Sequence, residues 1–273
     1  SPGDAVYDEF EELAYAGSAL AHNILGSPES VRGLTTTDCR AFLDQYYTHG
    51  NMVLYIDDPS DPAKLIRLAN KYFGKLHLPG NGHMRINAPD VEPFHKVHDR
   101  GGHQAHTITG ARLFGRNDPR RFSLFLLNNH LGGPCMNSLL NQELRERRGL
   151  VYTVDSSAAL LSDTGLLMIY FGCDPEQTER CRRVISETID RLAQNLVPER
   201  TFARMKEQYC GQLLVSTDHR ESMAMSMGKS LLYYNSLHNP ALTAEHVRAV
   251  TREELRQTAE LISPERLSSL TLR

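Results

Sequence analysis

The sequence predicts an α+β fold built from repeated units, each a mostly antiparallel sheet with helices packed on one face. Amphipathic helical stripes alternate with short strand-like runs, and neighbouring runs lie close enough along the chain to pair. Residues 31–56 also repeat at 247–272 with a constant offset of 216. Each copy carries a capping box, at Thr35 and at Thr251, so we expect a helix, a polar break and a short strand in both.

The repeat divides the chain into three expected parts. Residues 1–75 form the C-terminal part of a first unit, residues 76–99 a linker of loop-forming residues, and residues 100–273 a complete second unit. Subtracting the offset places the start of the first unit about 116 residues before Ser1. We therefore expect the back end of one domain, truncated, followed by the whole of another.

The complete unit begins with a candidate strand at 103–113 and a largely apolar helix at 119–131, which Gly132 and the next glycine end. The following stretch predicts a helix over 135–148, with Gly149 at its C′ position. Its apolar stripe has the spacing i, i+3, i+4, i+8 and consists of Met136, Leu139, Leu140 and Leu144.

Residues 150–154 and 164–173 then predict two neighbouring strands. Asp174 is expected to cap the next helix, with Pro175 at its first position. A helical pattern follows over 199–234.

The composition excludes several classes of protein. A net charge of −3 suggests no nucleic-acid partner, and no apolar run approaches the roughly 18 residues that a bilayer span needs. The five cysteines are odd in number and widely spaced, which predicts reduced, mostly buried thiols. That pattern favours the cytoplasm, and it leaves a periplasmic location open.

Arg145 stands out in the segment LRERRGLVYTV (144–154). Arg147 has Glu143 four residues before it, the favourable order for a helix ion pair, whereas Arg145 has no acidic residue at helical spacing. Its charge is therefore not neutralised locally. An unpaired arginine near a helix C-terminus gains about 0.3–1 kcal/mol from the helix dipole, which is one explanation.

Three blocks suggest a second explanation. They are residues 7–31, 130–154 (HLGGPCMNSLLNQELRERRGLVYTV) and 163–177 (DTGLLMIYFGCDPEQ). In order, they resemble the pitrilysin/insulinase-like family of zinc metallopeptidases (the inverzincins), in the two-unit branch that includes bacterial members and mitochondrial processing peptidase. The resemblance implies repeated α+β units that form a clamshell around an enclosed chamber, where peptides are degraded or processed.

The family's zinc site is missing from this sequence. Members hold zinc with an H-x-x-E-H helix and a downstream glutamate, and none of the 12 histidines here starts that motif. The resemblance implies that the motif lies upstream of Ser1. We therefore expect zinc in the full-length parent, a zinc metalloendopeptidase, and no metal or cofactor in this chain. The isolated chain is expected to be inactive, as the substrate-binding portion of that enzyme.

The resemblance also gives Arg145 a role. In the insulin-degrading branch, an arginine and a tyrosine seven positions apart bind substrate inside the chamber, and Arg145 and Tyr152 match that spacing. A guanidinium can donate to a peptide carbonyl and a phenol to a developing oxyanion, and losing one such donor costs about 2.7–4 kcal/mol of barrier. These two are the candidate catalytic residues, although Tyr152 also fits as an ordinary strand residue.

A two-unit chain can complete the clamshell only by pairing with another chain. We therefore expect a homodimer or heterodimer in which Arg145 and Tyr152 serve the partner's zinc site, with peptides as substrates. The alternative is a non-catalytic peptide-binding or scaffold subunit of the same family.

A glycine pair and two histidine pairs also have spacings that occur in functional sites. Gly132 and Gly133 resemble the substrate-contacting glycine-rich loop of the processing peptidase's non-catalytic subunit, but we interpret them as a helix terminator. The H-x-x-H pairs that begin at His95 and His103 have metal-like spacing, yet no cysteine and few carboxylates lie nearby, so no metal is expected there.

Overall fold

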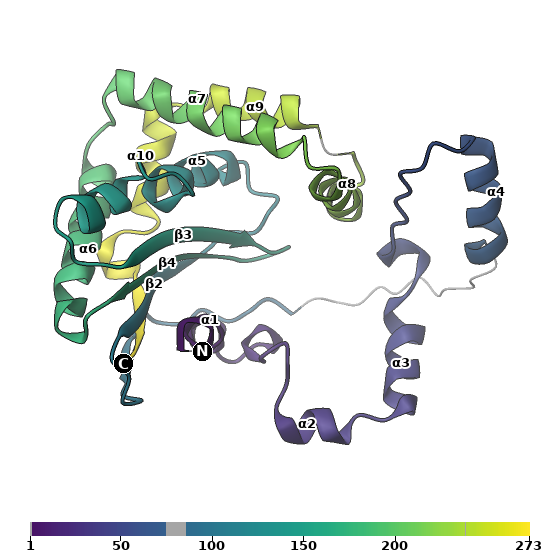
Figure 1. The fold of residues 1–273 in the computed structure, drawn as a ribbon, viewed down its shortest axis with the longest axis horizontal. Helices are drawn as coiled ribbons and strands as arrows, with labels where there is room; N and C mark the ends of the chain where they lie inside the picture. The colour runs from purple at the N-terminus through teal and green to yellow at the C-terminus, as the bar shows by residue number, and fades with distance from the viewer. Residues whose placement is uncertain (1, 75–85, 238) are drawn as a thin grey trace. The chain divides into compact units, whose positions relative to one another are not determined.

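Five strands form one sheet in the order β1-β5-β2-β4-β3 (Figure 1). The computed structural model describes residues 2–74, 86–237 and 239–273. β1 and β5 are parallel, and every other neighbouring pair is antiparallel, which confirms the α+β class and the mostly antiparallel sheet. The strands are β1 (His95–His98), β2 (Ala105–Leu113), β3 (Thr153–Leu160), β4 (Gly165–Cys173) and β5 (Ser268–Leu272).

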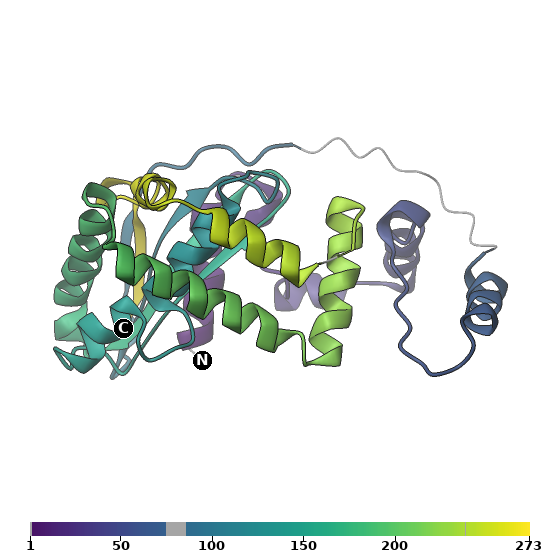
Figure 2. The same ribbon diagram turned by 90° about the horizontal axis from the view of Figure 1, so that it is seen from above.

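Three helices pack on one face of this sheet: α5 (Arg121–Gly132), α6 (Thr178–Gln194) and α10 (Arg252–Glu260). α6 does so because its apolar residues recur every three or four positions and are buried, among them Cys181, Ile185 and Ile189. Outside this layer, α7 (Glu199–Ser216) runs beside α9 (Pro240–Ala249) (Figures 1 and 2). Lys206 joins them by donating to the carbonyl oxygens of Arg248 (2.7 Å) and Val250 (2.8 Å).

The opposite face is covered too, which corrects the expectation of helices on one face alone. α1 (Pro2–Ala14) lays Val6, Phe10 and Ala14 on it, at a spacing of one helical turn. Gly110 makes the close approach possible, because a Cβ there would lie 3.2 Å from the Phe10 ring and 2.3 Å from the Leu167 carbonyl oxygen. The sheet residues in this second core layer are Ile108, Leu166, Met168, Leu270 and Leu272.

The chain falls into two units whose boundaries differ from the expected ones. The first comprises Ser1–Ile24, Asn87–Gly211 and Ala244–Arg273, and the second Leu25–Ile86 and Gln212–Thr243. The first helix therefore belongs with the sheet, because its apolar stripe is buried there.

Part of the expected linker, 76–99, is also structured. Its last residues form the edge strand β1, which the sequence did not predict because all four side chains are exposed and show no apolar alternation. Residues 76–85 of that linker lie outside the described residues.

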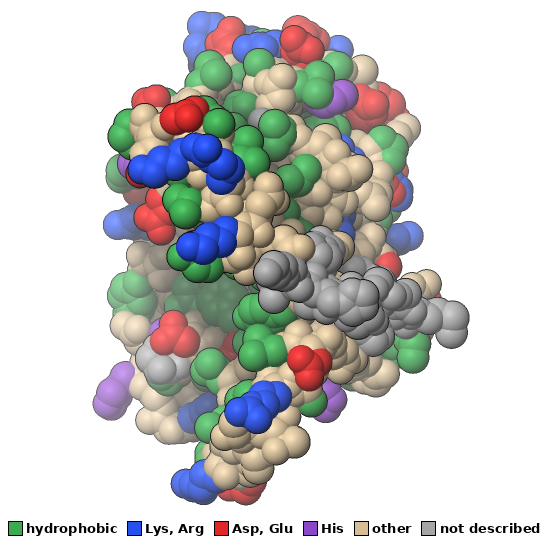
Figure 3. Space-filling model, turned by 90° about the vertical axis from the view of Figure 1, so that its right-hand side faces the viewer, with side chains coloured by type: hydrophobic (Ala, Val, Ile, Leu, Met, Phe, Trp, Pro, Cys, Tyr) green, Lys and Arg blue, Asp and Glu red, His purple; other side chains and the backbone are tan. Residues whose placement is uncertain are grey.

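The second unit is helical where it is described. It contains α2 (Pro28–Gly33), α3 (Thr36–Tyr46), α4 (Pro62–Phe73) and α8 (Arg220–Tyr234). Arg220 joins its two chain segments through a two-pronged ion pair with Asp57, at 2.8 and 2.9 Å. Many of its apolar side chains are exposed, and in Figure 3, which faces the side of α4, hydrophobic side chains (green) reach the surface among charged ones. Within the described ranges, no helix has the length and apolar character needed to cross a bilayer.

The repeat holds for the helices and fails for the strand. Both capping boxes are present, with the Thr35 amide donating to Asp38 (2.8 Å) and the Thr251 amide donating to Glu254 (2.7 Å). The second copy ends in β5, whereas residues 52–56 form no strand in the described structure. β5 has β1 and β2 on its two sides, and no described strand lies beside 52–56, so the expected strand there was wrong.

Removing the Phe10 ring, which packs α1 against the sheet, should destabilise the first unit. Phe10→Ala removes a fully buried side chain, so we expect a loss of about 3–5 kcal/mol in the free energy of unfolding. Urea unfolding followed by circular dichroism measures it. Met136→Ala, at a side chain that is 66% exposed in the same unit, is the control and should cost less than about 1 kcal/mol. Equal losses in the two variants would contradict this packing.

Candidate functional site

The helix expected over 135–148 starts later than predicted, and part of it is a π-helix. Residues 135–138 form a turn after Pro134, and the helical segment then passes through a π-helical turn, Asn141–Glu146, in which the Arg147 amide donates to the Gln142 carbonyl oxygen at 3.0 Å. The apolar stripe could not distinguish an α-helix from a π-helical turn, which adds one residue per hydrogen-bonded ring. Such turns are frequent at functional sites.

The end of this segment is as predicted. Gly149 has a φ of +59°, in the left-handed region that its C′ position requires. Its amide donates to the Arg145 carbonyl oxygen (2.9 Å), and the Leu150 amide donates to the Leu144 carbonyl oxygen (2.8 Å). The connection from the π turn to β3 is therefore held by backbone bonds.

Glu143 is the buried acid of the π turn, 6% exposed. Arg147 donates to its carboxylate at 2.7 Å, which confirms the predicted ion pair, and Arg148 donates to it as well. Arg191 approaches from α6 at 3.8 Å. The Arg148 hydrogen bond, with the charges of the three arginines, lowers the pKa of Glu143. Sequence spacing identified only Arg147, because the other two contacts depend on the π turn and on tertiary packing.

Arg145 is the arginine of this run that Glu143 does not hold. Its side chain is exposed and makes no hydrogen bond or ion pair with any residue that the structure describes. Its charge is therefore available to a ligand.

Tyr152 lies immediately before β3, where its amide donates to the Gly172 carbonyl oxygen at 2.8 Å. The side chain is 54% exposed, and its hydroxyl donates to Oδ1 of Asp174 at 2.6 Å. That hydrogen bond and the carboxylate charge raise the pKa of Tyr152. The phenol, protonated at neutral pH as tyrosines ordinarily are, can act as a donor.

Asp174 occupies the predicted N-cap position with Pro175 directly after it, but its side chain makes no capping hydrogen bond. The residues after it form a short 3₁₀ turn, Pro175–Gln177, α6 starts only at Thr178, and the Asp174 carboxylate is engaged by Tyr152 instead. Sequence reasoning missed this partnership because the pairing of β3 with β4 creates it.

Arg145 lies in the π turn and Tyr152 lies immediately before β3, so a short connection separates the two predicted residues. Leu150 and Val151, 6% and 7% exposed, anchor the connection, while Arg145 and Tyr152 are both exposed. No hydrogen bond joins their side chains, both of which belong to the described part of the chain.

The two glycines end α5, as the terminator interpretation predicts: Gly132 is its last residue, and the Gly133 amide donates to the Asn129 carbonyl oxygen at 3.1 Å. Gly132 also lets α5 approach the sheet, because a Cβ there would lie 2.6 Å from the Ser156 amide nitrogen of β3.

The described residues offer no ligand set for zinc. They contain no group of three or more histidine, cysteine or acidic side chains that could hold a metal ion. The histidines with metal-like spacing have other partners: His98 lies 3.1 Å from Glu9, His95 lies 2.9 Å from Ser269, and His106 lies 2.8 Å from Tyr170.

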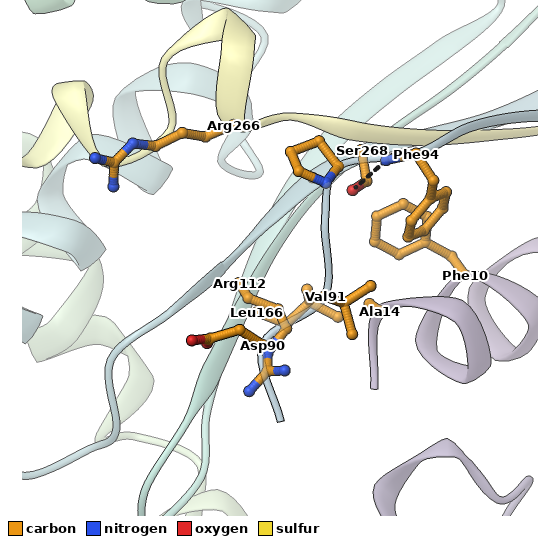
Figure 4. A pocket seen from close by; sticks show the side chains of 11 residues that line it. Phe10, Ala14, Asp90, Val91, Phe94, Arg112, Leu166, Arg266 and Ser268 are labelled. Atoms are coloured by element: carbon orange, nitrogen blue, oxygen red, sulfur yellow. Dashed lines mark hydrogen bonds between the residues drawn. The ribbon is translucent and has the colours of Figure 1, made fainter. Parts of the chain in front are cut away.

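A cavity of about 250 Å³ lies between α1, residues 90–94 and the sheet (Figure 4). Phe10, Phe94 and Leu166 give it apolar walls, and Arg112 lines it from β2. Neither Arg145 nor Tyr152 lines this cavity, so it is separate from the predicted residues.

Comparison with known proteins gives a consistent result. The sequence profile of the family described as "Peptidase M16 inactive domain" matches residues 33–209. An uncharacterized zinc protease of Streptomyces coelicolor is 29% identical, with 96% of this chain and 61% of the relative covered. One of Mycobacterium leprae is 27% identical (99% and 62%). A probable mitochondrial-processing peptidase subunit beta of Schizosaccharomyces pombe is 24% identical (94% and 58%). The chain thus spans about three fifths of the length of these relatives.

Solved structures share the fold. The peptidase M16 inactive domain from Pseudomonas fluorescens has a TM-score of 0.89 at 18% identity, covering 100% of this chain and 65% of that one. A protease from Helicobacter pylori has a TM-score of 0.88 at 17% identity, with 100% and 67% covered.

Removing the charge beside Tyr152 should make its phenol more acidic. In Asp174→Asn we expect the pKa of Tyr152 to fall toward the ordinary tyrosine value of about 10, because the anion that disfavours tyrosinate is gone. Titration by NMR of protein labelled with ¹³C at the tyrosine ring carbons measures it, with Tyr152→Phe to assign the signal. An unchanged midpoint would exclude the hydrogen bond as the cause.

Glu143 should stabilise the fold in a pH-dependent way. Because its folded pKa is lowered, its contribution is full above the unfolded value of about 4.3 and is lost as the pH falls through the folded pKa. Glu143→Gln should therefore cost about 1–3 kcal/mol of unfolding free energy at pH 7 and less below pH 4. Urea unfolding across pH tests this against the exposed Glu146→Gln in the same turn. A cost independent of pH would contradict the ion-pair explanation.

Proposed function

The chain belongs to the M16 peptidase family, and from that premise we propose that it is the substrate-binding, inactive portion of a zinc metalloendopeptidase. In this proposal the enzyme degrades or processes peptides in an enclosed chamber, and this chain alone hydrolyses nothing. The curated relatives named zinc proteases support the peptidase class. Since the described residues provide no zinc ligand set, the proposal places the metal in another segment of a longer polypeptide or on a partner chain.

One observation carries the proposal more than any other: Arg145 is exposed and unpaired among the described residues, although buried Glu143 holds two neighbouring arginines. Leaving one guanidinium unused gains nothing for stability beyond a small dipole term of about 0.3–1 kcal/mol. A guanidinium offers several donors in a fixed plane, which suits the carbonyl oxygens of an extended peptide.

Tyr152 supplies a second donor in this mechanism. Asp174 keeps the phenol oriented by accepting its hydrogen bond. When a peptide arrives, the hydroxyl can turn from Asp174 to an oxygen on which negative charge develops. Arg145 binds and positions the peptide, and Tyr152 stabilises that charge.

A partner chain is part of the proposal. The yeast relative is named as a subunit, which supports a two-chain assembly in which this portion faces the partner's zinc site. We also place the protein in the cytoplasm, where its five cysteines, which form no disulfide among the described residues, would stay reduced.

Losing either donor should cost the whole enzyme activity. In the longer polypeptide, Arg145→Ala and Tyr152→Phe should each lower kcat/KM about 100- to 1000-fold for an unstructured fluorogenic peptide. Arg183→Ala, which removes another exposed arginine without a described partner, is the matched control and should keep near-normal activity.

Mixing variants tests the shared site. Arg145→Ala mixed with a zinc-ligand variant should regain activity if the two groups act across chains, and no regain would refute action in trans. If the longer polypeptide cuts no peptide with zinc present, yet binds peptides, the non-catalytic scaffold alternative replaces the enzyme.

A further inference from the structure

A cavity of about 150 Å³, with both polar and apolar walls, lies where the end of α5 and residues 137–138 meet α7. α5 contributes Asn129 and His130 to its wall. α7 contributes Thr201, Arg204 and Gln208, which share one helix face because they are spaced by three and four residues. No aspartate or glutamate lines the cavity.

The cavity carries a single, uncompensated positive charge. The exposed guanidinium of Arg204 has no hydrogen bond or ion pair with any described residue. Among the acids of α7, Glu207, three residues later, forms no ion pair with Arg204, and Glu199, five residues earlier, is held by Arg252 at 3.0 Å. Burial lowers the pKa of His130 to about 4, so this imidazole is neutral at pH 7 and adds no charge.

Two largely buried polar residues present their side chains to the same space. Asn129 is 8% exposed and Ser138 is 3% exposed, both line the cavity, and neither side chain makes a hydrogen bond with a described residue. The amide and the hydroxyl are therefore available to a group that enters the cavity. The glycine at 133 leaves space for the amide, because a Cβ there would lie 2.5 Å from Oδ1 of Asn129.

The cavity is also held open in advance. Asn137 donates to Oε1 of Gln208 at 2.9 Å, and Gln208 donates back at 3.4 Å, so an amide pair ties the loop to α7. A site whose walls are fixed before binding loses less entropy when a ligand enters.

We propose that this cavity binds a carboxylate group of the peptide that the chain holds, an inference that rests on the proposed function. A guanidinium matches a carboxylate with two parallel hydrogen bonds, and the Asn129 amide and the hydroxyls of Ser138 and Thr201 supply further donors. The carboxylate is either the peptide's C-terminus or an aspartate or glutamate side chain.

The position of the cavity fits a peptide that also reaches Arg145. The Ser138 carbonyl oxygen accepts from the Gln142 amide at 3.0 Å, so the cavity wall continues directly into the π turn. The same short segment of chain thus carries both the cavity wall and Arg145.

A small carboxylate tests the cavity independently of peptide binding. N-acetylglycine added to the ¹⁵N-labelled chain should shift the signals of the Asn129 side-chain amide and the Ser138 backbone amide, and Arg204→Gln should abolish the shifts. Arg200→Gln removes an exposed arginine on the same helix outside the cavity and should leave them unchanged. No shift with N-acetylglycine, equal shifts with N-acetylglycinamide, or equal shifts with inorganic phosphate would each overturn the carboxylate assignment.

Peptides then identify the source of the carboxylate. Three rhodamine-labelled peptides of one sequence are compared by fluorescence anisotropy: amidated without acid, with a free C-terminus, and amidated with one internal glutamate. One or both acidic peptides should bind about tenfold more tightly than the neutral one, and Arg204→Gln but not Arg200→Gln should remove the gain. Tighter binding that survives Arg204→Gln overturns the inference. If no peptide binds while N-acetylglycine still shifts the cavity signals, the proposed function fails and the carboxylate site stands.

Discussion

The candidate site depends on the ion pairs that buried Glu143 forms. Its carboxylate holds Arg147 and Arg148 and draws Arg191 of α6 toward the π turn. A buried carboxylate must be paired, since an isolated charge in a poorly hydrated site is costly. The pairing holds the π turn to α6 and neutralises neighbouring positive charges. The exposed guanidinium of Arg145 stays outside it.

The sheet provides the rigid background for this segment. Helices α5, α6 and α10 cover one face and α1 covers the other, so the strands are fixed from both sides. On this support, the β3–β4 pairing brings Tyr152 to Asp174, and the backbone bond between Leu150 and Leu144 fixes the path between the two donors. The backbone of this segment is thus held by buried contacts, while the side chains of Arg145 and Tyr152 are exposed.

Each proposed contact with a peptide is a hydrogen bond that a protein side chain donates. A guanidinium and a phenol near the π turn, and a second guanidinium with an amide and hydroxyls in the α5–α7 cavity, suit a ligand whose acceptors are its carbonyl and carboxylate oxygens. Such contacts recognise the peptide chain more than its side chains. That is consistent with a chain whose family is described as an inactive peptidase domain, because binding of this kind needs no metal of its own.

By itself the sequence determined the α+β class, the two capping boxes, the glycine ends of α5 and of the π turn, and the ion pair that Glu143 forms with Arg147 and not with Arg145. Each rests on chemistry local in the chain: a hydroxyl three residues from an acid, a residue without a Cβ, an arginine without an acid one turn away. Only the tertiary structure decided that α1 covers the sheet, that His95–His98 form a strand, that Asp174 serves Tyr152, and that Asn129 and Arg204 share a cavity. Each of these features joins residues far apart in the sequence. The packing of the elements decides which surfaces are buried together, and no local pattern of residues encodes that packing.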